Sequence, residues 1–401
     1  MPTVTASVPA TRHFRYAVIL GSLAAFASLS IDMYLPAFPQ IGRDFGAPIG
    51  SVELTLSIFL AGMAVGQLFH GPLSDRYGRR VLLQAGTGLF VVSALGCALA
   101  PSIHALMAWR LFMALGGSAG QAVSRAIVRD WFQEHDAARY FSLLLGITGV
   151  APILAPLIGG QILEYAGWRA IFWLLAAFGA ACWLATTFAL PESLPRDRRT
   201  RTGIGAALRL YGRLLADSRF TPRVVALGFA YGTMFCYITG ASAVFIVGFG
   251  ISPQRFGLFF GANAVGLIGS SQLNRILLRR HTPRAILTAA YTLLVVFTVL
   301  LAVLGASGIG GFWLFTVTLF FCIALLGFIY PNGAALCLSH LGAVAGTASA
   351  LFGLGQFGIG SGGGSIVSFL HLSSPLPMTL PMAVFATIGY ALLWLTPKST
   401  P

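Results

Sequence analysis

The chain has 401 residues, of which 57% are hydrophobic and only 9% are charged, whereas about 25% of the residues in soluble domains are charged. This composition excludes a soluble globular protein and indicates a membrane protein. The net charge of +14 raises nucleic acid as a partner, but the positions of the basic residues favour anionic lipid headgroups instead. The five cysteines lie in apolar segments without CxxC spacing, so neither a disulfide framework nor a metal site is expected.

Twelve stretches reach the length of about 20 apolar residues that a membrane-spanning helix needs. One long polar connection divides them into two sets of six, as two rocking bundles would require. We therefore predict an all-α membrane protein with an N-terminal bundle over 16–190, a basic linker over 191–223 and a C-terminal bundle over 224–395, between tails 1–15 and 396–401. The predicted spans are 16–38, 52–72, 81–100, 103–126, 140–163, 168–190, 224–247, 256–278, 285–305, 312–336, 343–370 and 376–395.

The basic residues predict the orientation of these spans. If the N-terminus faces the cytoplasm, 21 Lys and Arg residues lie on the inner side and three, Arg43, Arg169 and Arg255, on the outer side. Because inner loops are enriched in basic residues, both termini are expected in the cytoplasm. The basic, Ala-containing N-terminus also resembles a signal peptide, but its cleavage would leave an odd number of spans.

Two charged residues lie at membrane depth, where ionisable groups are costly and usually functional. Asp32 is in the first span and Arg110 in the fourth, each roughly 10 to 12 Å below the outer surface at 1.5 Å per residue. A carboxyl that moves between an apolar site and a guanidinium can bind and release a proton, so both residues are candidates for proton coupling. A static buried ion pair, or an Asp that reaches the interface, is the alternative. Pro36 and Pro39 are expected to bend the span beside Asp32, although Pro39 alone could simply end it.

A short basic turn is predicted at the inner end of the second span. Residues Gly71 to Arg80 read GPLSDRYGRR, in which glycines permit a tight reversal and Asp75 can accept hydrogen bonds. A generic basic loop would explain the arginines but not the spacing of Gly71, Asp75 and Gly78. The sequence therefore predicts a latch on the cytoplasmic side.

This decapeptide resembles the signature loop of the major facilitator superfamily. LMAWRLFMALGGSAG around Arg110 looks like the span-4 motif of proton-linked members, and APLIGG from Ala155 to Gly160 is similar to the antiporter motif. The resemblance implies the two-bundle fold, a central cavity and a kinked fifth span. The residues it assigns to the antiporter motif are Ala155, Pro156, Gly159 and Gly160.

Three further segments resemble the bicyclomycin and chloramphenicol resistance (Bcr/CflA) subfamily of drug:proton antiporters. They are IDMYLP around Asp32, SRAIVRD from Ser124 to Asp130, and AGTASAL from Ala345 to Leu351. Met113 and Ala155 depart from the broader motifs, which usually have glutamine and glycine there, and Asn274 replaces Asp75 in a degenerate second signature loop. The expected cytoplasmic gate comprises Gly71, Asp75, Arg76, Gly78, Arg79, Arg80, Arg125 and Asp130.

Aromatic and polar groups in the spans are candidates for a substrate cavity, although each is individually more often a packing residue. Few fixed charges accompany them, which suits a bulky, moderately apolar ligand. The candidates are Tyr34, Tyr231, Phe235, Tyr237, Asn263, Tyr330, Asn332 and Gln356.

The sequence thus predicts a proton-coupled drug efflux antiporter of the bacterial inner membrane, not an enzyme, that works by alternating access. We expect a monomer with a drug-like substrate and the proton as partners, without cofactor, metal or nucleic acid. No nucleotide-binding loop is present in a suitable context, so the proton gradient is the expected energy source. A proton-linked nutrient symporter and a membrane receptor or scaffold that no longer transports are the alternatives.

Overall fold

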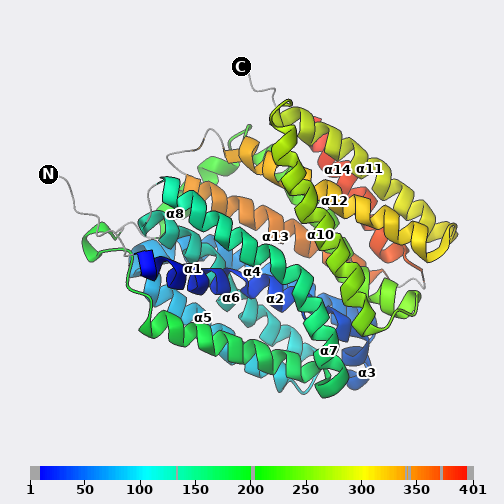
Figure 1. Ribbon diagram of the computed structural model, residues 1–401, viewed down its shortest axis with the longest axis horizontal. Helices are drawn as coiled ribbons and strands as arrows, with labels where there is room; N and C mark the ends of the chain where they lie inside the picture. The colour runs from blue at the N-terminus through cyan, green and yellow to red at the C-terminus, as the bar shows by residue number, and fades with distance from the viewer. Residues whose placement is uncertain are drawn as a thin grey trace.

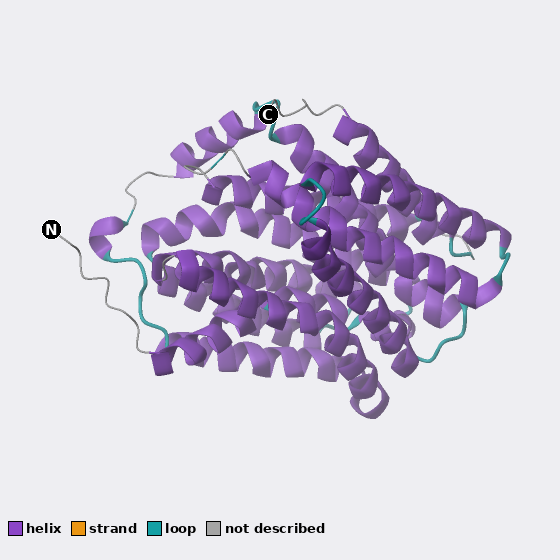
Figure 2. Cartoon of the chain, turned by 45° about the horizontal axis from the view of Figure 1, so that its top comes forward, coloured by secondary structure: helices purple, strands orange, loops and turns teal. Residues whose placement is uncertain are grey.

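The computed structural model describes residues 10–131, 134–199, 204–338, 341, 345–370 and 374–394. Within this part of the chain every regular element is a helix, and Figure 2 shows long helices joined by short loops. Residues 1–9 of the first predicted tail, and the second tail, lie outside it. The helices of the first half are α1 (Ala10–Ala24), α2 (Phe26–Asp32), η1 (Leu35–Ala37), α3 (Phe38–Phe45), α4 (Ile49–Tyr77), α5 (Arg79–Ala98), α6 (Ile103–Trp131) and α7 (Glu134–Phe188).

The linker contains two short helices, η2 (Arg196–Arg198) and α8 (Ile204–Leu215). The second half comprises α9 (Thr221–Ser242), the π-helical η3 (Ala243–Gly248), α10 (Pro253–Leu277), α11 (Pro283–Ser307), α12 (Gly311–Leu338), α13 (Ala345–Phe369) and α14 (Leu376–Trp394). Nine described helices are long and apolar enough to cross a membrane, or ten if the bent first segment counts as one span.

The first predicted span is broken rather than continuous. A bend of 42° separates the part that ends at Ala24 from the part that starts at Phe26. The helix then stops at Asp32 and resumes through the 3-10 turn η1, which contains Pro36. Pro39 lies in the first turn of α3, where a proline is tolerated, so it begins a helix instead of ending the span.

Helix α7 contains both the fifth and the sixth predicted spans. Its 55 residues are interrupted at Gly167, whose φ of 73° is not helical. The part before Gly167 runs along α1 and α2 in one direction, and the part after it runs back along them. Four contacts show this reversal: Gly21 with Ile147, Met33 with Gly159, Tyr34 with Phe172, and Phe26 with Phe178.

The predicted turn over Gly71 to Arg80 is much shorter than the sequence suggested. Helix α4 continues through Pro72 to Tyr77, and α5 begins at Arg79. The reversal is made by Gly78 alone, with a φ of 106° that favours glycine. Hydropathy placed the end of the span where the apolar residues stop, whereas the helix extends beyond that layer.

Two helix pairs join the halves along their length: α4 packs against α13, and α7 against α10. Figure 1 shows α13 and α4 between the blue-to-cyan helices α1, α2, α5 and α6 and the yellow-to-red helices α11, α12 and α14. Linker helix α8 contacts both α4 and α13. We call the end of the molecule with the α4–α5 turn the basic end, and the end with α3 and the start of α10 the opposite end.

Candidate functional site

Asp32 lies where the first helical segment breaks, at the junction of the two halves. It is the last residue of α2, and its side chain is only 4% exposed. Across the junction, Tyr237 of α9 interacts with it electrostatically, and the Tyr237 hydroxyl accepts a hydrogen bond from Asn263 Nδ2 at 2.9 Å. Among the described residues no cation forms an ion pair with Asp32. A carboxyl in this place faces both halves without a fixed counter-ion.

Arg110 lies at the same depth but is bound elsewhere. Its side chain is fully buried, and Nη1 donates a hydrogen bond of 2.9 Å to the Ser30 carbonyl, two residues before Asp32. The guanidinium lies over the rings of Tyr34 and Phe59, 4.3 and 4.2 Å from their centroids. Among the described residues, its Nε and Nη2 have no hydrogen-bond partner. The cation is thus held by a backbone dipole and aromatic faces.

The Tyr34 ring that covers Arg110 is itself fixed by a hydrogen bond to α4. The Tyr34 hydroxyl lies 2.8 Å from Thr55 Oγ1, and both side chains are buried. Thr55 uses its own proton to bind the Val52 carbonyl at 2.6 Å, so Tyr34 is the donor to Thr55. Tyr34 therefore supports Arg110 rather than lining an open cavity.

The paired glycines of the antiporter motif each permit one close helix contact. A Cβ on Gly159 would lie 1.7 Å from the carbonyl oxygen of Met33, the residue after Asp32. A Cβ on Gly160 would lie 2.8 Å from the carbonyl oxygen of Pro253, at the start of α10. The motif therefore joins the Asp32 segment on one side to the second half on the other. Ala155 is fully buried, in agreement with a packing position.

At the basic end, Arg79 is the centre of the latch cluster, which we define as Asp75, Arg79, Asp130 and Glu192. Arg79 contacts Asp75 at 2.5 Å and Asp130 at 3.0 Å, and its side chain is 9% exposed. Its backbone N–H donates to Glu192 Oε1 at 2.9 Å. These bonds tie α4, α5, α6 and the linker together within the first half.

Glu192 explains why the signature loop needs glycine at position 78. The carboxylate accepts hydrogen bonds from the N–H groups of Arg79 and Arg80 and pairs with Arg199 at 3.5 Å. A Cβ on Gly78 would lie 2.5 Å from Glu192 Oε2. The φ of 106° disfavours any other residue here, and a side chain would also displace the ends of Glu192 and Arg199.

The other expected gate residues are placed differently. The Arg80 guanidinium donates a hydrogen bond to the Thr187 carbonyl on α7. The Arg76 guanidinium carbon lies 5.3 Å from the centroid of the Tyr77 ring. Gly71 has no close neighbour that a Cβ would meet. The structure thus separates the latch cluster from residues that only surround it.

Arg125 lies apart from the latch cluster and faces the second half. Its side chain is exposed to solvent, and it interacts electrostatically with Tyr231 of α9 and with Arg129. Tyr231 stacks on Tyr330 of α12, with ring centroids 4.0 Å apart and planes 12° apart. A guanidinium of the first half thus lies near a stacked aromatic pair of the second half.

Three further cavity candidates fall into two groups. Phe235 lies one helical turn after Tyr231, and its ring centroid is 6.1 Å from that of Phe357 on α13. Gln356, also on α13, is partly exposed. Asn332, in contrast, is buried and donates to Asn274 Oδ1 at 2.6 Å. Asn332 therefore joins α12 to the degenerate signature loop and serves packing.

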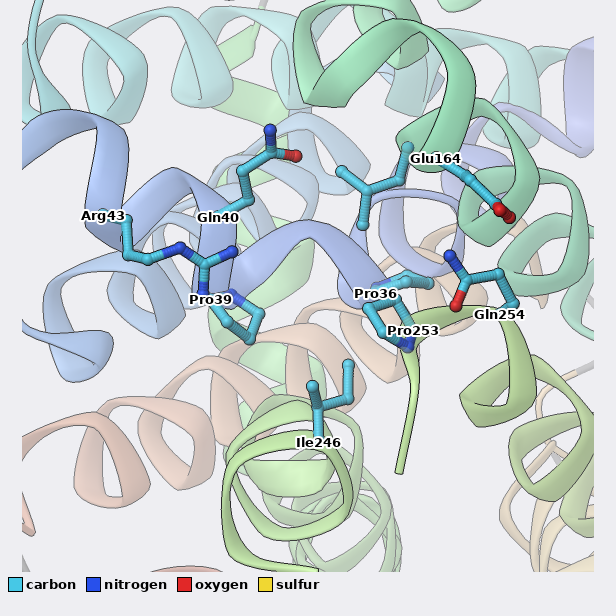
Figure 3. Close-up of a pocket in the computed structure, with 9 residues that line it drawn as sticks. Pro36, Pro39, Gln40, Arg43, Glu164, Ile246, Pro253 and Gln254 are labelled. Atoms are coloured by element: carbon cyan, nitrogen blue, oxygen red, sulfur yellow. The ribbon is translucent and has the colours of Figure 1, made fainter. Parts of the chain in front are cut away.

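A cavity of about 280 Å³ opens between the halves at the opposite end. Figure 3 shows Pro36, Pro39, Gln40 and Arg43 from the first half facing Ile246, Pro253 and Gln254 from the second, with Glu164 at the side. Gly160 packs against Pro253 of this lining. The two halves are therefore in contact at Gly160 and Pro253, and the cavity separates them on the side of this contact toward the opposite end.

Sequence reasoning missed three residues of this site. Glu192 follows the sixth span in the segment PES, and its only signal was an acid within a basic linker. Glu53 of α4 is 4% exposed. Because it is the second residue of the predicted span 52–72, the sequence places it at the membrane surface, where an acid is not costly. Thr55 had no signal, because only the tertiary fold places it against Tyr34.

Comparison with known proteins agrees with this architecture. A family model described as Major Facilitator Superfamily matches residues 20–365. The chain is 36% identical to the uncharacterized MFS-type transporter YdgK of Bacillus subtilis, with 93% of each chain covered. It is 29% identical to a bicyclomycin resistance protein homolog of Haemophilus influenzae, covering 94% of each, and 30% identical to a chloramphenicol resistance protein of Pseudomonas aeruginosa, covering 92% of this chain and 88% of that one.

The fold is also that of a solved transporter. A partially occluded, inward-open structure of the xylose transporter XylE from E. coli superposes with a TM-score of 0.75 over 96% of this chain and 98% of the other, at 12% identity. The likeness concerns the fold alone. Together these matches identify a transporter rather than an enzyme, with multiple spans in the bacterial inner membrane. The chain belongs to the major facilitator superfamily and, within it, is similar to the bicyclomycin and chloramphenicol resistance proteins of the Bcr/CflA type.

Proposed function

We propose that this protein is a proton-coupled drug efflux antiporter that works by alternating access. The observation that carries the proposal is the placement of Asp32, a buried acid without a cation partner among the described residues, at the junction of the two halves. Such a group can exchange its proton with whichever side has access to the junction. The resistance proteins among its relatives support drugs as the substrate class.

The proposed topology has twelve spans in two bundles, 16–190 and 224–395, with the linker 191–223 and both termini in the cytoplasm. The reversal of α7 at Gly167 supports two spans in that helix, and the basic residues support the orientation. The basic end then faces the cytoplasm. The cavity beside Pro39 and Arg43 faces the outside.

The proposed cycle follows from this arrangement. Drug reaches Arg125 and the Tyr231–Tyr330 pair from the cytoplasm, while Asp32 releases its proton inward. After the halves rock, the drug leaves outward and Asp32 takes up an external proton. Arg110 acts as a positioning residue, because it fixes the Ser30 carbonyl and hence the end of α2.

The test uses everted membrane vesicles and two drugs named for its relatives, chloramphenicol and bicyclomycin. Transport into the vesicles should release protons from their lumen, and Asp32→Asn should abolish that exchange. Unchanged drug-dependent proton movement in Asp32→Asn would refute the role of Asp32. Cells that accumulate more of the substrate when the gene is present would refute export.

A further inference from the structure

A second acid is as deeply buried as Asp32 and has no place in this cycle. Glu53 of α4 is 4% exposed, and Asp32 and Glu53 are the two acids whose side chains are buried in the part of the chain that the structure describes. Within that part Glu53 has neither an ion pair nor a hydrogen bond from its side chain. A buried carboxylate without a cation or hydrogen-bond donors is strongly disfavoured relative to the protonated acid.

The position of Glu53 along α4 places it on the seam between the two halves. Residues at spacings of four and seven lie on one helical face, so Glu53, Ser57 and Ala64 share a face. The Ser57 carbonyl accepts a hydrogen bond of 2.7 Å from Ser361 of α13, and Ala64 packs against Gly358 of the same helix. This face of α4 is therefore the one that meets α13.

The two helices run in opposite directions along this seam. Ser57 lies beside Gly364, and farther along α4, Gln67 lies beside Gly353. Glu53, one turn before Ser57, thus lies toward the end of α13, at the opposite end of the seam. It therefore occupies the part of the interface that must separate when the halves open at that end.

In the described part of the chain, no charged group on the neighbouring elements forms an ion pair with Glu53. The described residues of α13 include no titratable side chain, and those of α8 lie at the basic end. On α3, Asp44 accepts a hydrogen bond from Trp168 and pairs with Arg169. Arg43, also on α3, lines the cavity at the opposite end. Toward the opposite end, the remaining titratable groups on the adjoining elements are Tyr34 beside η1, Cys97 on α5, His104 and Arg110 on α6, and Cys236 and Tyr237 on α9.

We propose that Glu53 is a second proton-binding carboxyl of the transporter. It holds its proton while α4 and α13 are closed over it, as here, and exchanges that proton with external water when the seam opens. The proton passes between water and the carboxyl oxygen, and no other bond changes. Because this proton comes from and returns to the same side, Glu53 ties the opening of the seam to external pH, while the proton that crosses the membrane in exchange for drug is the one carried by Asp32. This dependence rests on the proposed antiport, whereas the protonated state of Glu53 does not.

Infrared spectroscopy of the full-length protein in liposomes tests the protonation directly. At neutral pH the carbonyl band of a protonated carboxyl is expected in the wild type and should lose one carboxyl's intensity in Glu53→Gln. Glu53→Asp should retain the band, and Glu164→Gln, at an exposed acid, should leave the protonated-carboxyl band unchanged. Glutamine has the size of the protonated side chain, so the variant is expected to fold. An unchanged band in Glu53→Gln would overturn the proposal.

Proteoliposomes with an internal pH dye test the link to seam opening. With chloramphenicol as the drug, wild-type transport should slow as the pH on the external face rises, because Glu53 must regain its proton before the seam closes. Glu53→Gln, which is always neutral, should weaken this pH dependence and leave the number of protons moved per drug unchanged, while Asp32→Asn should uncouple transport. An unaltered pH dependence in Glu53→Gln refutes the proposed exchange. If Asp32→Asn leaves coupling unchanged, the proposed function itself is wrong, and the infrared result still decides whether Glu53 is protonated.

Discussion

Arg110 and Ser30 are joined by a hydrogen bond of 2.9 Å that replaces the ion pair one would expect between Arg110 and Asp32. The guanidinium stabilises the carbonyl two residues before the acid, where the helix is about to end. The aromatic rings of Tyr34 and Phe59 cover the rest of the cation. In this arrangement Arg110 shapes the segment that carries Asp32, and Asp32 stays available for exchange with a proton.

The stacking of Arg110 predicts that lysine cannot replace it. Arg110→Lys keeps the charge but loses the planar contact with two rings, each of which contributes about 0.5–2 kcal/mol. We expect a loss of about 1–3 kcal/mol, which is measured either as an at least tenfold drop in chloramphenicol efflux or as a lower free energy of unfolding. Arg169→Lys is the matched control, because Arg169 also stacks on a ring, Trp168, at 4.2 Å but is 44% exposed. Equal effects in the two variants would contradict the role given to Arg110.

Gly159→Ala is expected to abolish transport because its Cβ would overlap the Met33 carbonyl next to Asp32. The backbone must move to accept it, which destabilises the α2–α7 contact by about 1–3 kcal/mol. Gly146→Ala on the same helix is the control, since no described residue lies within 4 Å of the added atom and alanine favours helix by up to about 1 kcal/mol. Drug efflux and thermal unfolding of both variants check this. Normal efflux in Gly159→Ala would show that the contact is not needed.

Removing the charge of Glu192 should weaken the latch cluster. Glu192→Gln keeps the shape but replaces a carboxylate that accepts from Arg79 and Arg80 with a neutral amide, at a cost of about 1–2 kcal/mol. Because these bonds lie within the first half, we expect lower stability with intact drug binding. Chemical unfolding and chloramphenicol binding measure the two effects. Glu164→Gln at the opposite end should change neither, and a similar loss there would refute a specific latch.

The Tyr34–Thr55 hydrogen bond can be measured by a double-mutant cycle. Tyr34→Phe and Thr55→Val each remove one partner, and we expect a coupling free energy of about 1 kcal/mol between them. The cycle uses thermal unfolding of the two single variants and the double variant. A coupling near zero would mean that the pair does not hold the ring over Arg110. Thr298→Val, whose hydroxyl bonds only within its own helix, serves as the unrelated buried control.

The linker offers one group outside the spans whose ionisation can be followed. Tyr211 of α8 is buried and donates a hydrogen bond of 2.8 Å to the Leu68 carbonyl of α4. Burial, with a smaller effect from the negative charge of Asp75, raises the pKa of Tyr211 to about 12. Since the folded pKa is higher than the unfolded value, the contribution of Tyr211 is complete below the ordinary tyrosine range and is lost as pH rises toward 12. Tyr211→Phe should therefore remove part of the alkaline loss of stability measured by pH-dependent unfolding.

Local sequence was sufficient for the helical architecture and for several individual residues. Runs of apolar residues are long enough to identify spans because lipid cannot satisfy a free backbone group. The signature motifs identified Asp75, Arg79 and Asp130, which the structure brings together, and the paired glycines Gly159 and Gly160, which it places at close contacts. Helix ends were less accurate: α4 continues past Pro72, and the first span breaks at Ala25, because the ends depend on packing beyond the apolar layer.

The sequence by itself thus determined the membrane class, the basic distribution and the identity of the acid at membrane depth, since these follow from hydropathy and charge. Only the tertiary structure decided that Arg110 binds the Ser30 carbonyl, that Glu192 holds the α4–α5 turn, and that Glu53 lies on the seam with α13. Each of these relationships joins residues far apart in the chain. Their partners are selected by which helix faces meet, and that choice is made by the packing of all the helices together.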